Sequence, residues 1–132
     1  MPQLDPENDR MISFDGAELG LTVWDPEAEP EIVIVGIHGM NDYANAFHMA
    51  APYWAERGVK TYAYDQRGFG RSYGRGEWPD EESMREDLRT AVALVRAEHP
   101  ETTLAVVGIS MGGSVTMTAC GSDRPPEGVD RV

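Results

Sequence analysis

Three short β-prone runs, each followed by a segment with helical spacing, constrain the fold of this chain most strongly. Residues 32–37 (IVIVGI) are continuously apolar, as in a strand that is buried on both faces of a sheet. Residues 59–64 and 102–109 are also β-prone. Because parallel strands need crossover connections, usually helices, this alternation predicts an α/β fold with a mostly parallel sheet and helices on both faces.

An antiparallel hairpin is predicted ahead of this alternation. Residues 10–14 and 18–24 are β-prone, and between them lies Asp15-Gly16, a dipeptide that favours tight turns. Residues 1–9 are polar and contain proline, so we expect a loose arm there. The chain is therefore expected to begin with an arm and a hairpin.

The predicted helices carry their own start and end signals. Pro52 is tolerated only in a first turn, so a regular helix should begin near Ala51, and Gly58 suits the left-handed position after its end. Asp80 can cap a longer helix. The apolar stripe of that helix follows at helical spacing: Met84, Leu88, Ala91, Val92 and Val95. Small residues over 112–120 suit a closely packed third helix.

The composition is that of one globular domain, with 41% apolar and 26% charged residues. We expect a single domain made of a loose arm (1–9), a core with five strands (10–120) and a tail (121–132). The net charge of −12 argues against nucleic acid and anionic membranes as partners. No apolar run approaches the ~20 residues of a transmembrane segment. With one cysteine, Cys120, and no signal-peptide pattern, we expect a cytoplasmic setting.

A G-x-S-x-G motif lies between the third run and the small-residue helix. A nucleophile on such a sharp strand-to-helix turn needs small neighbours, which Gly108, Gly112 and Gly113 supply. The turn would raise the Ser110 hydroxyl above the sheet, at the positive end of the following helix. The alternative is a glycine-rich turn with an incidental serine, and the strand and helix around the motif favour the nucleophile.

Two phosphate-binding alternatives fail. Gly108 and Gly113 have the Walker A spacing, but Ser114 stands where that motif requires lysine. Gly68 and Gly70 suggest a dinucleotide loop, yet Tyr73 occupies the third glycine position and no helix is predicted to begin there.

The sequence His38-Gly39-Met40 follows the first apolar run, on the ligand side of an open α/β sheet. An acyl-transfer site needs two N–H donors for the developing oxyanion, and the amides of Met111 and Met40 are the candidates. Gly39 would let the chain turn the Met40 amide inward. We expect His38 to shape this loop and not to transfer protons.

A third motif, D-Q-R-G-F-G-R-S over 65–72, follows the second run. It could bind substrate, but we favour a structural role in which Asp65 and Arg67 tie down the loop by charge-assisted hydrogen bonds.

Together, H-G-M, D-Q-R-G-F-G-R-S and G-I-S-M-G-G resemble the α/β-hydrolase family over residues 32–120. Within that family they resemble the lysophospholipase and monoacylglycerol-lipase-like esterases, the serine aminopeptidase S33-type hydrolases. The resemblance implies the N-terminal portion of the fold, with Ser110 as nucleophile at the nucleophile elbow. It further implies an oxyanion hole made by the amides of Met40 and Met111, and no metal or organic cofactor.

The chain departs from the family in its triad. The family's acid and histidine follow the nucleophile, whereas His38, His48 and His99 all precede Ser110. We therefore expect the acid and the base to lie outside this chain, and the fold to be truncated before its sixth strand. Residues 130–132 resemble the start of that strand, cut off before it pairs, so the fifth strand should be an exposed edge.

The implied activity is that of a serine hydrolase acting on a small ester or lipid substrate, of the acylglycerol or lysophospholipid type. Peptidase and thioesterase activities remain open, and the isolated chain should be inactive. The rival is a catalytically silent fragment or assembly module, completed by a C-terminal chain or self-associating through the exposed sheet edge.

Overall fold

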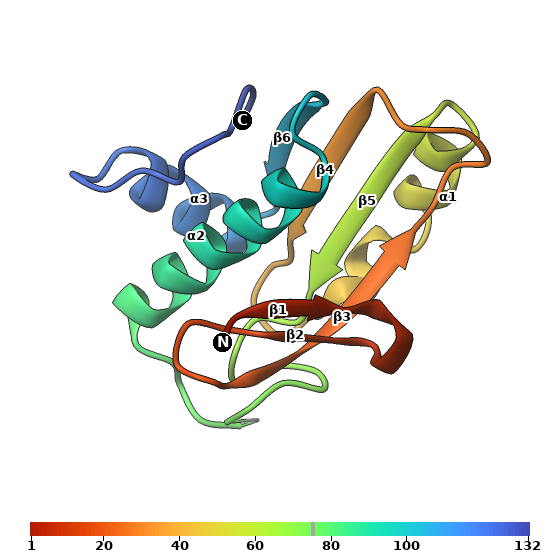
Figure 1. Cartoon of the computed structure of the whole chain (residues 1–132). Coiled ribbons are helices and arrows are strands. Elements are labelled where there is room, and N and C mark those ends of the chain that lie inside the picture. The colour runs from red at the N-terminus through yellow and green to blue at the C-terminus, as the bar shows by residue number, and fades with distance from the viewer. Residues whose placement is uncertain (75) are drawn as a thin grey trace.

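The computed structural model describes residues 1–74 and 76–132 and contains one six-stranded sheet (Figure 1). The strands lie in the order β1-β2-β3-β5-β4-β6. Their bounds are β1 (Gln3–Asp5), β2 (Arg10–Ile12), β3 (Glu18–Trp24), β4 (Ile32–Ile37), β5 (Val59–Tyr64) and β6 (Thr103–Gly108). Strand β4 pairs in parallel with β5 and β6, whereas β1, β2, β3 and β5 pair antiparallel in that order. The predicted hairpin and parallel sheet are confirmed.

The helices cover both faces of the sheet. Helices α2 (Glu81–Glu98) and α3 (Met111–Cys120) lie on one face, and α1 (Ala50–Ala55) lies on the other (Figure 1). The Asp80 side chain caps α2 by accepting from the Glu82 N–H at 3.0 Å, as predicted. A 3₁₀ helix (Ala44–Phe47) precedes α1, which begins at Ala50, next to the predicted start near Ala51.

Each face has its own core. The larger core lies under α2 and α3, and its members alternate along the strands, as Val33, Val35 and Ile37 do on β4. The smaller core lies under α1 and consists of Ala44, Phe47, Ala51 and Ala63. Glycine at position 36 leaves room for it, because a Cβ there would lie 2.8 Å from the Phe47 ring. The 3₁₀ helix is therefore seated directly on β4.

The predicted loose arm is corrected by the structure. Residues 3–5 form β1, which pairs with β2, and residues 6–8 form a 3₁₀ helix. Leu4 packs against the larger core, and the Arg10 guanidinium pairs with the Asp5 carboxylate at 2.8 Å. A three-residue strand is too short to show a hydrophobic period, so periodicity could not predict it.

β6 is the edge strand of the sheet, as predicted, but the expectation that residues 130–132 end before they pair with it is corrected. Arg131 forms a parallel bridge with Ala105 and accepts from the Val106 N–H at 2.9 Å. The Asp130 carboxylate accepts from the Leu104 N–H at 2.9 Å and pairs with Arg96 at 2.8 Å. Because these bonds fasten the tail, residues 130–131 pair with the edge strand instead of ending short of it.

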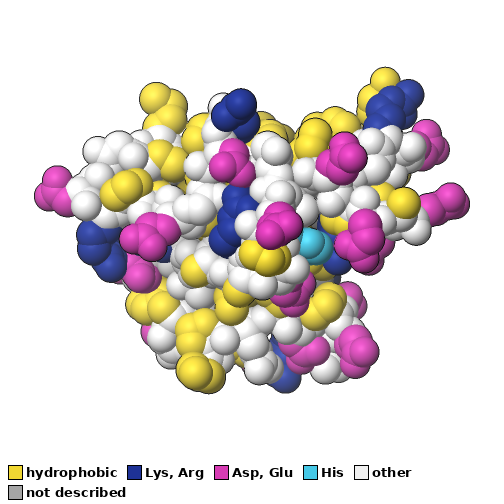
Figure 2. Space-filling view, turned by 45° about the horizontal axis from the view of Figure 1, so that its top comes forward, with side chains coloured by type: hydrophobic (Ala, Val, Ile, Leu, Met, Phe, Trp, Pro, Cys, Tyr) yellow, Lys and Arg dark blue, Asp and Glu magenta, His cyan; other side chains and the backbone are white. Residues whose placement is uncertain are grey.

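The surface carries the expected acidic excess. Acidic side chains are spread over the face shown in Figure 2, and the basic side chains there do not gather into one patch. None of the helices in the described part of the chain has the length and apolar character needed to span a bilayer.

Candidate active site

Ser110 occupies a sharp turn at the carboxyl end of β6, directly before α3. Its backbone has φ +54° and ψ −113°, a conformation that residues other than glycine rarely adopt. The side chain is exposed and does not cap α3. The hydroxyl is thus held above the strand end, beside the N-terminus of a ten-residue helix, by a strained backbone.

Two glycines of the motif are required by close packing around this turn. A Cβ at Gly108 would lie 2.6 Å from the Gly112 carbonyl oxygen, and a Cβ at Gly112 would overlap the Ile37 carbonyl oxygen. Gly113 differs, because its nearest neighbour, the Gly108 oxygen, would lie 3.5 Å away in ordinary van der Waals contact. The packing therefore explains Gly108 and Gly112 and leaves room for a larger residue at position 113.

The loop of residues 38–44, which we call the 38–44 loop, lies against this turn. A Cβ at Gly39 would lie 3.4 Å from the Ser110 Cβ and 3.3 Å from the Ile109 oxygen. The next residue is Met40, and the Met40 and Met111 amides donate no hydrogen bond to any other described residue. The sequence motifs at the ends of β4 and β6 thus come together in space, with two free N–H groups beside the serine.

His38 is fully buried at the start of this loop. Its Nδ1 donates to the Gly39 oxygen at 2.7 Å, and its Nε2 accepts from the Gln66 N–H at 2.8 Å. Burial holds the pKa of His38 below its ordinary value, so the ring is neutral. Since both ring nitrogens are occupied, these contacts are those of a histidine that shapes a loop.

The other two histidines lie elsewhere. His99 follows the C-terminus of α2, where its Nε2 lies 2.9 Å from the Tyr62 hydroxyl, at the opposite end of the sheet from Ser110. His48 is exposed, and its Nδ1 donates to the Asn45 oxygen at 2.7 Å. Within the described part of the chain, the Ser110 hydroxyl has no histidine as a hydrogen-bond partner.

Residues 65–72, which we call the 65–72 loop, follow β5 at the same edge of the sheet. The buried Asp65 carboxylate accepts from the Ala44 N–H at 2.8 Å and from the Arg71 N–H at 2.9 Å. Burial raises the pKa of Asp65, but the hydrogen bonds from Arg71 and Ala44 outweigh this effect and hold the pKa below its ordinary value. Asp65 therefore ties the loop down, as predicted.

Arg67 anchors the same loop from its other side. Its Nε donates to one Asp87 carboxylate oxygen and its Nη2 to the other, both at 2.7 Å. Its Nη1 donates to Asp15 at 2.9 Å, and the Ser13 hydroxyl donates to Asp87. Burial raises the pKa of Asp87 in spite of these donors. The predicted structural role of Arg67 is confirmed.

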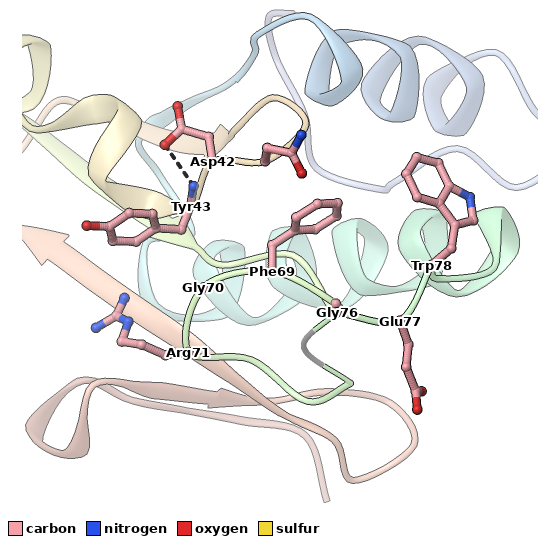
Figure 3. A pocket seen from close by; sticks show the side chains of 10 residues that line it. Asp42, Tyr43, Phe69, Gly70, Arg71, Gly76, Glu77 and Trp78 are labelled. Carbon is pink, nitrogen blue, oxygen red and sulfur yellow. Dashed lines mark hydrogen bonds between the residues drawn. The ribbon is translucent and has the colours of Figure 1, made fainter.

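An open pocket of about 840 Å³ lies between the 38–44 loop on one side and residues 68–71 and 76–78 on the other. Figure 3 shows the Phe69 ring between Asp42 and Trp78, and the carboxylate of Glu77 pointing away from it. Residues 68–71 belong to the D-Q-R-G-F-G-R-S motif, for which a structural role was favoured, whereas the sequence did not point to Asp42, Tyr43, Glu77 or Trp78. An exposed tryptophan in a glycine-rich segment, as at position 78, is the one signal that could have found them.

Comparison with known proteins agrees with this geometry. The sequence model of the family described as serine aminopeptidase S33 matches residues 28–132. Monoacylglycerol lipase of Mycolicibacterium smegmatis is 36% identical over 113 residues, which are 85% of this chain and 40% of that protein. Monoglyceride lipase of Rattus norvegicus is 28% identical over 127 residues, 94% of this chain and 42% of that protein.

Solved structures show the same fold. A soluble variant of monoglyceride lipase from Saccharomyces cerevisiae, in complex with a substrate analogue, matches with a TM-score of 0.73 and 28% identity. The match covers 83% of this chain and 38% of that one. A thermostable carboxyl esterase from Bacillus coagulans matches with a TM-score of 0.71 at 24% identity, covering 81% of this chain and 37% of that one. The chain thus spans about two fifths of the length of the curated relatives named above.

Proposed function

Since this chain belongs to the serine aminopeptidase S33 family of α/β-hydrolases, we propose that it carries the nucleophile and oxyanion hole of a serine hydrolase. The reaction is the hydrolysis of a carboxylic ester, of the acylglycerol or lysophospholipid type. The names of the bacterial and rat relatives, monoacylglycerol lipase and monoglyceride lipase, support this substrate class.

The observation that carries the proposal is the backbone of Ser110. A serine at φ +54° costs about 1–3 kcal/mol of conformational strain, and a glycine would adopt this conformation more easily. Residue type and geometry agree only if the hydroxyl itself is needed at this position. The free amides of Met40 and Met111 beside it support the same interpretation.

The reaction follows the serine-hydrolase sequence. The Ser110 oxygen attacks the ester carbonyl carbon while its proton passes to a histidine, and the Met40 and Met111 N–H groups donate to the resulting oxyanion. The bond to the alcohol then breaks as the histidine returns the proton to the leaving oxygen. Water repeats both steps on the acyl-serine, releasing the carboxylic acid and restoring the hydroxyl.

The histidine and its acidic partner are proposed to come from outside these 132 residues. His38 has both nitrogens engaged, His48 donates its Nδ1–H to the Asn45 oxygen, and His99 lies at the far end of the sheet. Oxyanion donors without a base retain only a small part of triad catalysis, so residues 1–132 alone should hydrolyse esters close to the uncatalysed rate. Triad-like turnover by this segment alone would contradict the proposed source of the base.

A fluorophosphonate probe, which reacts with activated serines, tests the proposal. The protein expressed from its complete gene should be labelled at Ser110, and Ser110→Ala should abolish labelling. Ser114→Ala, one helical turn further along α3, is the matched control and should label normally. If the complete protein binds a partner chain but Ser110 is not labelled, the chain is a silent assembly module and the enzyme proposal is wrong.

A further inference from the structure

The 38–44 loop is fastened at both ends to two neighbouring residues of the 65–72 loop. At the first end, the Gln66 side-chain Nε2 donates to the His38 oxygen at 2.9 Å, and the Gln66 backbone N–H donates to the His38 ring at 2.8 Å. At the far end, Asp65 accepts from the Ala44 N–H at 2.8 Å. All four residues are buried.

Between these anchors, the loop has few contacts of its own. The Met40 side chain is 52% exposed, and Asn41 adopts a left-handed conformation with φ +59°. The Gly39 oxygen, which belongs to the same peptide group as the Met40 N–H, accepts from the His38 Nδ1 at 2.7 Å and from the Asp42 N–H at 3.3 Å. The orientation of the Met40 amide therefore depends on the placement of His38, which Gln66 holds at the ring and at the carbonyl oxygen.

Only one end of the Gln66 side-chain amide is hydrogen-bonded. Its Oε1 is buried and has no hydrogen-bond partner among the described residues. Rotating the amide would not help, because it would place Oε1 against the His38 oxygen, and both atoms are acceptors. An apolar side chain of similar length would avoid the unpaired Oε1, but it would leave the buried His38 carbonyl oxygen without this donor. What glutamine adds at this position is therefore a hydrogen bond that holds the start of the 38–44 loop.

We propose that Gln66 is a positioning residue, which holds the His38 carbonyl and thereby aims the Met40 N–H at the oxyanion. This inference rests on the proposed function of Ser110. Oxyanion donors act within about 2.7–3.1 Å of the position that the oxyanion takes in the transition state. A small displacement of the loop therefore reduces the stabilisation of the transition state more than the binding of the substrate. It lowers kcat more than it changes KM.

The first test replaces Gln66 in the protein expressed from its complete gene. Gln66→Met keeps the length of the side chain and removes the donor. We expect kcat to fall about tenfold, a smaller loss than deleting an oxyanion donor, while KM stays within about twofold. The rate of fluorophosphonate labelling at Ser110 should fall by a similar factor.

A second variant adds a pH signature. In Gln66→Glu the ionised carboxylate cannot donate to the His38 oxygen, but the protonated acid can. Burial raises the pKa of such a carboxyl group. The ratio of variant to wild-type kcat should therefore rise toward acidic pH, whereas the ratio for Gln66→Met should stay constant.

The control separates positioning from a general loss of stability. Tyr62→Phe removes the hydrogen bond from a buried tyrosine hydroxyl to Glu98 at the opposite end of the sheet, and should leave kcat unchanged. Amide hydrogen exchange over residues 39–43 gives a readout independent of activity, and should be faster in Gln66→Met than in Tyr62→Phe.

Each outcome decides the inference. If wild-type Ser110 is labelled and Gln66→Met keeps the wild-type kcat and exchange rates, the positioning role is wrong and the proposed function stands. If Tyr62→Phe lowers kcat as much as Gln66→Met does, the effect is one of stability and the role is again wrong. If wild-type Ser110 is not labelled, the proposed function fails, and the inference fails with it.

Discussion

The elbow at residues 108–113 and the 65–72 loop are both glycine-rich turns at the same edge of the sheet, yet they differ in which residue carries the unusual backbone. In the 65–72 loop, Gly68 and Gly70 take the positive φ values, +87° and +54°. In the elbow, Ser110 takes φ +54° although glycines stand nearby. A positive φ at glycine marks a turn, whereas a positive φ at serine marks a side chain that is needed there.

The two turns also differ in their polar groups. In the 65–72 loop, the Asp65, Arg67 and Ser72 side chains all form hydrogen bonds inside the protein. At the elbow, the Ser110 hydroxyl is exposed and the Met111 N–H has no acceptor among the described residues. These three side chains of the 65–72 loop are thus bound within the fold, whereas the polar groups of the elbow are left free.

The largest expected effect comes from breaking the ion pairs that anchor the 65–72 loop. Arg67→Met leaves the buried Asp87 carboxylate without its main partner, which should lower the free energy of unfolding by about 3–5 kcal/mol. The control is Arg124→Met, which breaks an exposed ion pair with Glu86 and should cost less than about 1 kcal/mol. Urea unfolding measures both, and equal losses would mean that the buried network is not the anchor described above.

A smaller loss is expected from crowding the elbow. Gly112→Ala forces a methyl group against the Ile37 carbonyl and should destabilise the protein by about 2–3 kcal/mol. Gly113→Ala has room and improves helix propensity, so it should be neutral or stabilise by up to about 1 kcal/mol. Thermal unfolding of the two variants, side by side, checks the prediction, and similar losses at both positions would contradict the close packing described for Gly112.

The smallest effect is a gain. Ser110→Gly relieves the strained backbone and should raise the stability by about 1 kcal/mol while abolishing fluorophosphonate labelling. Ser114→Gly places glycine inside α3 and should instead destabilise by about 0.5–1 kcal/mol. Differential scanning calorimetry distinguishes the two signs, and a loss at both positions would mean that Ser110 is not strained.

Much of the fold follows from the sequence because its signals are local. The apolar run of β4, the Asp80 cap and the Asp15-Gly16 turn each act within a few residues, and each predicted element is present. Strand β1 was missed because three residues show no period. The tail was mispredicted because its pairing depends on Asp130 reaching Leu104, which lies on a different element.

The candidate site was predicted less completely, for the same reason. The G-x-S-x-G motif and the H-G-M motif have their own sequence patterns, so Ser110 and Met40 could be named in advance. Gln66 could not, because its role depends on a contact with His38, 28 residues away. The partners of Arg67, 20 and 52 residues away, were equally hidden.

The exposed indole of Trp78 lines the pocket, so its fluorescence can report on what binds there. The other two tryptophans, Trp24 and Trp54, pack against the smaller core on the opposite face, while Trp78 is 68% exposed beside Phe69. An apolar ligand that covered this indole would transfer it from water to an apolar environment and shift its fluorescence emission to shorter wavelength. Ligand titrations could therefore be followed by intrinsic fluorescence, without turnover and without an added dye.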